Sequence, residues 1–349
     1  MMNNALQTYN GELSLITRPM PKVTSPNDVL IKVTHAGVCG TDLSIIAGRF
    51  EAAKKIIQGH EFSGVVSGVG AKVKHLKIGD RICVNPYNYC GSCAFCVRGQ
   101  PQFCVKEAMK TALGYQKDGG FQEYIVLPGH LCFPLPPTMQ LRQSVFCQPL
   151  STILRGWDNM GKIALDSKVL IAGAGIVGLL WASLFHFHGY RDVTISEIND
   201  QRKEMAARLN LGYPARHPKD IGDDYKAAET NGDLTWGFDV IVDCSGNKRA
   251  VEDAFRWLRH GATFVLFGVC GKGVNVSFEG YSIYQKELRI VSSFLNRFSY
   301  ARTVNLVHHM SDRYLDFKHL EVASYSLHDY EAALDALRKG VISKAVFEF

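Results

Sequence analysis

The sequence predicts a β-rich domain followed by an α/β domain whose parallel sheet is doubly wound. The chain has 349 residues, enough for about two domains of roughly 150 residues each. Short apolar runs separated by turn residues fill about the first 150 positions, and this texture is typical of β-structure. From about residue 167 onward, apolar strands alternate with amphipathic helices, which favours a parallel sheet with helical crossovers.

The individual elements follow from the same patterns. In the first domain the run 29–33, Val-Leu-Ile-Lys-Val, is a typical strand. In the second domain the strand candidates are 168–172, 193–196, 238–243 and 262–267, and the helix candidates between them are 179–188, 200–209 and 250–259. The apolar segment 170–187 is nearly long enough to cross a bilayer, but three glycines interrupt its first half. We interpret it as a buried strand that turns into a buried helix.

Composition and charge narrow the function classes. Hydrophobic residues make up 46% of the chain and charged residues 21%, which excludes a disordered or fibrous protein. The net charge of +6 is spread without a basic block, so neither nucleic acid nor a membrane is expected as a partner. The N-terminal residues lack the pattern of a secretory signal. Ten cysteines then indicate a reducing, cytoplasmic location, where thiols serve as metal ligands or core residues.

Four cysteines lie close together in the first domain: Cys90, Cys93, Cys96 and Cys104. Four thiolates close a tetrahedral shell around zinc and leave no open position, so such a site stabilises a loop and performs no chemistry. An iron–sulfur cluster also takes four thiolates, but the Cys-Pro pair that accompanies such clusters in some proteins is missing. The spacing therefore favours a structural zinc.

A second candidate metal site is split between two segments bracketed by glycines. The first contains Cys39 and Thr41, and the second contains His60 followed by Glu61. A catalytic zinc needs three protein ligands and a free position for water or substrate. Cys39, His60 and Glu61 could supply these three ligands. The glycine-rich turn farther along the chain strengthens this interpretation.

A glycine-rich turn follows the first strand of the second domain. Gly173, Gly175 and Gly178, with Ile176 and Val177 between the last two, come after an apolar strand and before an apolar helix. The first glycine permits the tight turn, the second lets a pyrophosphate approach the backbone, and the third lets helix and strand pack closely. The pattern predicts a dinucleotide site.

The acidic residue Glu197 ends the next strand. A carboxylate at this place accepts hydrogen bonds from a ribose diol and repels a 2′-phosphate. The sequence therefore favours NAD over NADP, although Arg202 leaves NADP open.

These motifs make the chain resemble the zinc-dependent medium-chain dehydrogenase/reductase superfamily over its whole length. The branch it resembles contains the polyol, sugar-alcohol (sorbitol, arabinitol) and threonine dehydrogenases. The stretches that carry the resemblance are 36–42, 59–64, 78–81, the four-cysteine lobe, 118–124, the glycine turn and 285–288.

The resemblance implies an architecture. It implies a GroES-like catalytic domain at 1–149 with a zinc lobe at about 88–106, a Rossmann nucleotide-binding domain at 150–290, and a segment at 291–349 that returns to the catalytic domain. It also implies a homodimer or homotetramer, commonly joined through the edge of the nucleotide domain.

The resemblance assigns roles by position as well. Cys39, His60 and Glu61 match the ligands of the catalytic zinc. Thr41 matches the hydroxyl that passes the substrate proton toward the cofactor ribose, and Lys344 matches a basic residue that reaches the NAD pyrophosphate.

Two positions depart from the family pattern. Gln148 stands where the polyol branch usually has Glu and where alcohol dehydrogenases have a cysteine ligand. As a neutral ligand it would leave zinc about one net positive charge, which Glu61 as a ligand would cancel. Alternatively, Gln148 binds only the zinc-bound water, or the change weakens metal affinity. Ser44 stands where many relatives have the histidine that hands the proton to solvent, so the last proton-transfer step stays open.

The motifs and the resemblance together predict zinc- and NAD-dependent oxidation of a secondary alcohol by hydride transfer. The expected substrate is a small polyol or sugar alcohol, and threonine oxidised at its β-hydroxyl is second. Substrate contacts are expected from the cleft between the domains, with Phe50, Tyr115, Phe294 and Asn296 as candidates.

Three other functions fit some of the same residues. A catalytically silent NAD-binding protein is the main alternative, and two zinc ions per chain would indicate the enzyme instead. A zinc-free quinone reductase fits poorly with Cys39 and the His60-Glu61 pair. A zinc-ribbon nucleic-acid binder would need basic charge gathered around the four-cysteine lobe, and the charge is not gathered there.

Overall fold

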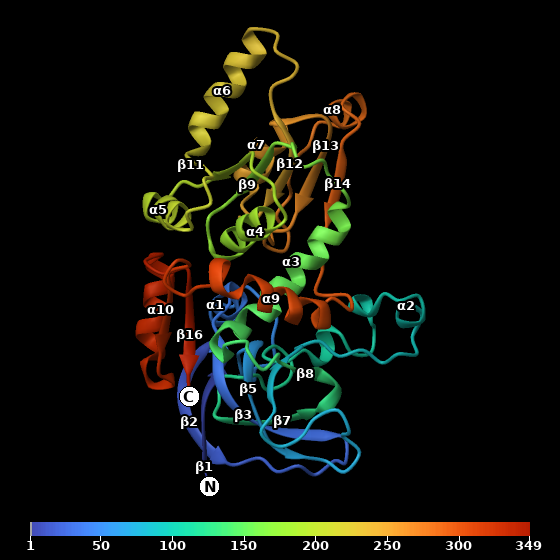
Figure 1. Ribbon diagram of the computed structural model, residues 1–349, viewed down its shortest axis with the longest axis vertical. Coiled ribbons are helices and arrows are strands. Elements are labelled where there is room, and N and C mark those ends of the chain that lie inside the picture. Colours follow the sequence, from blue (N-terminus) through green and yellow to red (C-terminus); the bar gives the residue numbers. More distant parts are fainter. Residues whose placement is uncertain (1) are drawn as a thin grey trace. The chain divides into compact units, whose positions relative to one another are not determined.

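The computed structural model describes residues 2–349 and divides the chain into two compact units (Figure 1). The first unit contains the residues up to Thr152 together with Leu295–Lys318 and Val322–Phe349, so the C-terminal segment packs with the N-terminal part. The second unit contains Ile153–Phe294 and His319–Glu321. Among residues 2–349, none of the helices combines the length and the apolar character needed to span a membrane.

The first unit is built on two sheets. A three-stranded sheet has the order β2-β1-β4, and a seven-stranded sheet has the order β15-β16-β3-β5-β6-β8, with β7 also pairing with β3. The strands are β1 (Met2–Tyr9), β2 (Glu12–Pro19), β3 (Asp28–Gly37), β4 (Lys55–Ile57), β5 (Glu61–Val69), β6 (Arg81–Val84), β7 (Tyr124–Pro128), β8 (Cys132–Pro134), β15 (Val322–Tyr325) and β16 (Lys344–Glu348). The prediction of a β-rich first domain is confirmed.

Helices in this part of the chain connect the strands. They are α1 (Gly40–Ile46), α2 (Ala94–Val97), α3 (Cys147–Met160), which continues into the second unit, α9 (Tyr300–Tyr314) and α10 (Tyr330–Lys339). Short 3-10 helices occupy Pro101–Phe103, Met109–Thr111, Gly129–Leu131, Leu141–Phe146 and Leu327–Asp329. Helix α10 ends at Gly340, whose φ of 70° suits a residue without a side chain.

Strand β3 is the centre of the seven-stranded sheet. It shows the period of two expected for a strand, with Val29, Ile31 and Val33 fully buried. Its last residue, Gly37, is paired with Glu61 at the start of β5 and with Val346 near the start of β16. One end of β3 therefore brings together three parts of the chain that are far apart in sequence.

The second unit contains a six-stranded sheet with the order β11-β10-β9-β12-β13-β14, and every pair in it is parallel. The strands are β9 (Val169–Ala172), β10 (Val193–Ser196), β11 (Ala215–Arg216), β12 (Phe238–Asp243), β13 (Leu258–Leu266) and β14 (Arg289–Ser292). The helices are α4 (Ile176–Phe187), α5 (Asp200–Arg208), α6 (Pro218–Thr230), α7 (Lys248–Arg256) and α8 (Gly280–Gln285).

The strand order of this sheet reverses between β9 and β12. The chain runs from β9 through β10 to β11 on one side and from β12 through β13 to β14 on the other. This is the doubly wound arrangement, in which ligands bind beyond the carboxyl ends of the strands at the reversal. The prediction of a doubly wound parallel sheet is confirmed.

Several predicted boundaries are wrong: the helix expected at 179–188 begins at Ile176, and the strand expected at 262–267 begins at Leu258. The helix expected at 250–259 ends at Arg256, because Leu258 already belongs to β13, where it is 1% exposed and pairs with Phe238. Phe255 and Leu258 are three residues apart and therefore look helical in sequence. Pairing with the neighbouring strand overrides that local pattern.

Candidate functional site

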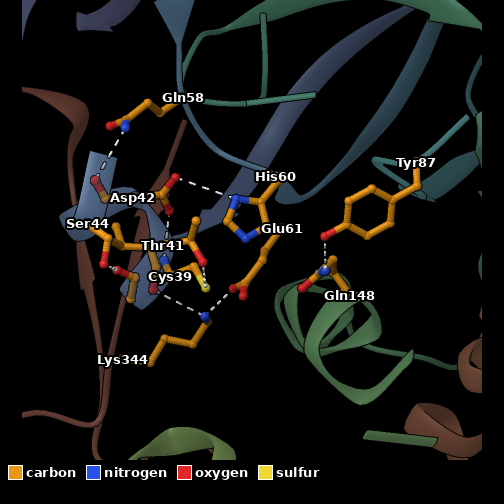
Figure 2. Close-up of polar contacts among 12 residues, drawn as sticks. Cys39, Thr41, Asp42, Ser44, Gln58, His60, Glu61, Tyr87, Gln148 and Lys344 are labelled. Carbon is orange, nitrogen blue, oxygen red and sulfur yellow. Dashed lines mark hydrogen bonds and ion pairs between the residues drawn. The ribbon is translucent and has the colours of Figure 1, made fainter. Parts of the chain in front are cut away.

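A cluster of potential metal ligands lies where β3 ends and β5 begins. Cys39 is the N-cap of α1, directly after β3, and His60 and Glu61 stand at the start of β5. The pairing of Gly37 with Glu61 brings the two segments together. One donor atom from each of Cys39, His60 and Glu61 lies within 4.8 Å of the others (Figure 2).

Asp42 holds this cluster in place. One of its carboxylate oxygens accepts a hydrogen bond of 2.8 Å from the Cys39 backbone N–H, and the other lies 3.5 Å from Nδ1 of His60. Burial opposes a charge on His60, but Asp42 and the Cys39 thiol outweigh burial and raise the pKa of His60 well above its usual value. A half-buried thiol and two buried carboxylates around one imidazole form a donor set that favours a cation, so these residues fit a zinc ion.

Lys344 has a different partner from the one that the resemblance implies. It is the first residue of β16, it is 1% exposed, and its ammonium group bonds to Oε2 of Glu61 and to the carbonyl oxygen of Val38 at 3.3 Å (Figure 2). The implied role was contact with a pyrophosphate. In the structure the buried carboxylate of Glu61 binds the ammonium group, because a buried charge needs an opposite charge nearby.

Helix α1 carries two hydroxyl groups, on Thr41 and Ser44, that differ in whether they lie beside the metal cluster. The Cys39 thiol lies 3.8 Å from Oγ1 of Thr41, so this hydroxyl is adjacent to the cluster. The hydroxyl of Ser44 donates a hydrogen bond of 3.0 Å to the carbonyl oxygen of Gly40 within its own helix. Ser44 is therefore engaged locally.

Gln148 sits in the first turn of α3 and is 5% exposed. Its side-chain nitrogen donates to the hydroxyl of Tyr87 at 3.4 Å. Figure 2 shows this pair on one side of the cluster and Lys344 on another. The Gln148 side chain is thus held beside the cluster by a tyrosine.

Aromatic rings line the same site. The ring of Tyr115 lies 4.6 Å from that of His60, 5.6 Å from that of Phe50 and 6.4 Å from that of Tyr87. Two of the four substrate candidates, Phe50 and Tyr115, are therefore next to the metal cluster. Their apolar faces would keep water away from a substrate bound there.

The other two substrate candidates lie elsewhere. Asn296 is 6% exposed and donates to Oδ1 of Asn85 at 3.0 Å and to Oγ of Ser151 at 3.1 Å. It lines a cavity whose wall includes Tyr87. Phe294 is 48% exposed and belongs to the second unit.

The four cysteines of the lobe converge. Their sulfur atoms all lie within 4.8 Å of one another, with 4.0 Å between Cys90 and Cys96 and 3.9 Å between Cys93 and Cys104. Four sulfurs placed tetrahedrally at about 2.3 Å from one zinc ion are about 3.8 Å apart. Backbone hydrogen bonding by Ser92 lowers the pKa of Cys90 to about 6, which favours the thiolate. The geometry fits a single ion.

The glycine turn has three distinct roles in the second unit. Gly173 has a φ of 110°, which favours glycine. A Cβ atom on Gly178 would lie 1.9 Å from the carbonyl oxygen of Gly173, so the close approach of α4 to the turn excludes a side chain. A Cβ atom on Gly175 would meet nothing within 4 Å, so protein packing leaves open space at this position. A pyrophosphate at the N-terminus of α4 would use that space.

Glu197 is 6% exposed, and its carboxylate accepts hydrogen bonds from the glycine turn and from the residues that follow Glu197. One carboxylate oxygen accepts from the backbone N–H of Ala174 at 2.9 Å, and the other accepts from those of Ile198 and Asn199 at 2.9 and 3.0 Å. Arg202 lies in the first turn of α5, where its backbone N–H donates to the Asn199 side chain. The first residues of α4, Ile176 and Val177, are half-buried at the same turn.

Sequence reasoning missed three features of the site. Asp42 lies inside the quoted stretch 36–42, three residues after Cys39, and its position at N3 of a helix was a usable signal. Tyr87 carried no signal. The pairing of Lys344 with Glu61 joins residues 283 positions apart, so only the folded chain shows it.

Comparison with known proteins connects this site with a family. Residues 25–137 match the model of the alcohol dehydrogenase GroES-like domain, and residues 177–311 match the model of the zinc-binding dehydrogenase. Among curated proteins, the chain is 30% identical to D-arabinitol dehydrogenase 1 of Uromyces fabae over 328 residues, which cover 93% of this chain and 91% of that protein. It is 31% identical to D-xylulose reductase A of Aspergillus niger over 329 residues, covering 93% and 90%.

Solved structures show the same fold. A zinc-binding dehydrogenase from Sinorhizobium meliloti 1021, bound to NADP, matches with a TM-score of 0.88 and 30% identity over 100% of both chains. A protein from Escherichia coli CFT073, solved as a short chain alcohol dehydrogenase with NADH, matches with a TM-score of 0.86 and 25% identity, covering 100% of this chain and 99% of that one.

Proposed function

Because the chain belongs to the family of zinc-binding alcohol dehydrogenases, we propose that it oxidises a secondary hydroxyl of a polyol or sugar alcohol to a ketone with NAD as hydride acceptor. The observation that carries the proposal is the convergence of Cys39, His60 and Glu61 at the end of β3. Similarity to proteins named for D-arabinitol and D-xylulose supports a substrate of this class.

Cys39, His60 and Glu61 are the residues that we assign to the catalytic zinc. When bound, zinc supplies a Lewis acid that lowers the pKa of an alcohol hydroxyl. Asp42 lies 3.5 Å from Nδ1 of His60, and it fixes Cys39 by accepting a hydrogen bond from the Cys39 backbone N–H. Lys344 balances the charge of Glu61 from the opposite side. Gln148 remains an alternative to Glu61 as the third ligand.

The hydroxyl of Thr41 is the group that we assign to pass the substrate's proton on toward the ribose of a bound cofactor, since it adjoins Cys39. Ser44 does not continue this path, because its own proton is donated to Gly40. Phe50 and Tyr115 would hold the carbon chain of the substrate and exclude water from it.

The second unit supplies the cofactor site. Gly173, Gly175 and Gly178 with Ile176 and Val177 form the turn and helix start that we assign to the pyrophosphate. NAD, when bound, accepts the hydride. Glu197 supports NAD over NADP, because its buried carboxylate would repel a 2′-phosphate at the end of β10. We assign Arg202 to the adenosine end of the same site.

Cys90, Cys93, Cys96 and Cys104 are assigned to a structural zinc ion. Their distances suit one ion held by four thiolates. This site leaves no ligand position free, so its role is to order the lobe and not to take part in the reaction.

Two alternatives receive less support. Threonine would need a partner for its carboxylate, and Lys344, the buried cation of the cluster, is already paired with Glu61. A silent NAD-binding protein would have no need for the converging donors of Cys39, His60 and Glu61, although Gln148 and Ser44 depart from the family pattern.

We further propose a homodimer, with a homotetramer as the alternative, and a cytoplasmic location. Strand β14 forms an edge of the six-stranded sheet, and its Ile290 is 42% exposed, so the edge can pair with a second copy. Light scattering of wild type and Ile290→Lys tests the dimer. The two groups of reduced cysteines favour a reducing compartment.

NADH formation measured with four- to six-carbon polyols, aldonates and threonine, before and after a zinc chelator, tests the proposed function. We expect turnover of one stereochemical series of polyols that the chelator abolishes. Absence of turnover on every polyol, with NAD still bound, would overturn the proposal and favour the silent protein.

A further inference from the structure

The second unit contains a pocket of about 510 Å³. This volume falls within the range of about 300–1,000 Å³ that is typical of small-molecule sites. All strands of the parallel sheet begin at one edge, and the glycine turn follows β9 at the other edge. Arg256 and Leu288 line the pocket and come just before β13 and β14 begin. The pocket is therefore distinct from the proposed cofactor site.

Two helix faces contribute to this pocket. On α7, Glu252, Phe255 and Arg256 are three and four positions apart, so they share one face of the helix (Figure 1). Glu279, the N-cap of α8, and Ser282 in the same helix are also three positions apart and line the pocket together. Side chains from two helices that are not consecutive thus meet around one space.

Aromatic and aliphatic side chains supply the apolar surface of the pocket. The rings of Phe255 and Phe278 stack at 4.2 Å and 26°. Tyr225 of α6 and Leu288 also line the pocket, and both pack, partly buried, against the core cluster that contains Phe255. The ring of Tyr225 lies 5.6 Å from that of Trp236. Core packing therefore fixes the apolar surface.

Two carboxylates of the pocket are held by other residues that line it. Oε1 of Glu252 accepts a hydrogen bond of 2.8 Å from the backbone N–H of Ser277, and Nζ of Lys248 lies 3.7 Å from the same oxygen. Oε2 of Glu279 accepts a hydrogen bond from the hydroxyl of Ser282. Because Ser277 and Ser282 line the pocket too, these bonds hold the carboxylates at its surface. Each carboxylate keeps a second oxygen that these bonds do not use.

Two cations line the same pocket. The ammonium group of Lys286 donates to the carbonyl oxygen of Leu258 at 2.8 Å and keeps two further protons. For the guanidinium group of Arg256, residues 2–349 supply neither a hydrogen bond nor an ion pair. Burial raises the pKa of Tyr225, the charge of Arg256 opposes that rise, and the charge of Glu279 adds to it. The charged ends of Arg256 and Glu279 therefore both lie near the Tyr225 hydroxyl.

We propose that this pocket binds a small zwitterion with an apolar side chain, such as an aromatic amino acid. The carboxylate of the ligand binds Arg256, whose planar guanidinium suits a carboxylate, and the ammonium group binds Glu279. The apolar side chain packs against Phe278 and Tyr225. A ligand with a single charge would be repelled by two of the four charged groups, whereas a zwitterion has an opposite charge for each kind.

NMR titration of L-phenylalanine tests this site on the zinc-loaded protein saturated with NADH, which keeps the nucleotide site filled. We expect Arg256→Gln and Glu279→Gln to weaken binding by about tenfold or more, the loss of one hydrogen bond between charged groups. Arg249→Gln on the same helix and Glu287→Gln just after α8 are the matched controls, because neither residue lines the pocket. Both should leave the affinity within about twofold of wild type. Thermal melting checks that each variant is folded.

Three matched probes test the chemistry. 3-Phenylpropionate lacks the ammonium group, 2-phenylethylamine lacks the carboxylate, and L-alanine lacks the ring, so each should bind about tenfold more weakly than L-phenylalanine. An amino acid can also bind zinc, and binding of that kind would be unchanged in Arg256→Gln. Such an unchanged affinity, equal binding of 3-phenylpropionate, or no binding to the wild-type protein would overturn the inference.

Tryptophan fluorescence locates the bound probe independently of the charged variants. Because Tyr225 lines the pocket and contacts Trp236, L-phenylalanine should change the emission of the wild-type protein and of Trp157→Phe, and the change should be lost in Trp236→Phe. A change that persists in Trp236→Phe would place the probe elsewhere and contradict the inference. The inference does not rest on the proposed reaction. If no polyol is oxidised and binding still depends on Arg256, the proposed function fails while this inference stands.

Discussion

Lys344 and Glu61 form an ion pair that is almost completely buried, although 283 positions separate them in the chain. The pair joins the first residue of β16 to the first residue of β5 across the end of β3. It thereby ties the C-terminal segment to the candidate catalytic metal site, and it places a cation beside one of the proposed zinc ligands.

Removal of Lys344 should destabilise the metal-free protein. In Lys344→Met the carboxylate of Glu61 is left buried without a counter-charge, which costs about 3 kcal/mol. Zinc at the cluster would supply positive charge, so the loss should be smaller after zinc loading. Chemical denaturation with and without zinc measures both values. Lys339→Met, which breaks an exposed pair with Asp335, is the control and should change stability by less than about 1 kcal/mol. An equal loss with and without zinc would contradict the proposed assignment of Glu61.

Gly37 makes room for the same ion pair. A Cβ atom there would lie 2.7 Å from Cε of Lys344 and 2.8 Å from Oε2 of Glu61. Gly37→Ala should therefore lower the free energy of unfolding by about 1–3 kcal/mol and weaken zinc retention. Gly280→Ala, at a glycine whose Cβ would meet nothing within 4 Å, is the matched control. Retention of zinc by Gly37→Ala at the wild-type level would argue against the coupling.

Two glycines of the turn should have different roles: Gly175 leaves room for NAD, and Gly178 lets α4 pack against the turn. Gly175→Ala adds a methyl group to open space, so stability should be unchanged while NAD binding weakens by about tenfold, or about 1.4 kcal/mol. Gly178→Ala forces α4 away from Gly173 and should cost about 3 kcal/mol of stability. Thermal melting and titration with NADH measure the two effects. The turn would lose its assignment if Gly175→Ala bound NADH normally.

Gln148→Glu tests the role of the neutral side chain beside the cluster. A second carboxylate near Glu61 should hold zinc more tightly and cancel more of its positive charge. Zinc release to a chelator should therefore slow, and polyol turnover should fall because the metal polarises the alcohol less. Unchanged zinc release and turnover would mean that Gln148 acts only through Tyr87.

Metal analysis should find two zinc ions per chain. Cys104→Ser removes one thiolate of the lobe, so one zinc should be lost and the melting temperature should fall, since metal binding and folding are coupled at such sites. Cys270→Ser, outside both clusters, should keep both ions. A single zinc in the wild-type protein would support the silent alternative instead.

Sequence by itself determined the fold class, the four-cysteine lobe and the second set of potential metal ligands, which includes Cys39. The apolar runs 169–172 and 240–242 made the strands expected at 168–172 and 238–243 recognisable, because parallel strands covered on both faces have apolar runs. The glycine turn and the lobe were recognisable because their residues are close in sequence and their chemistry depends on spacing. Cys39, His60 and Glu61 could be identified as potential metal ligands from their residue types. The sequence does not show that their side chains converge.

Tertiary structure alone decided which distant residues share a site. The partner of Lys344 depends on the pairing of β16 with β3, and the Tyr87 contact of Gln148 depends on α3 lying beside the segment that follows β6. Periodicity in the sequence reports which face of an element is buried, but it carries no information on which buried faces meet. That information arises only when the sheet closes and charged or polar groups must find partners inside it.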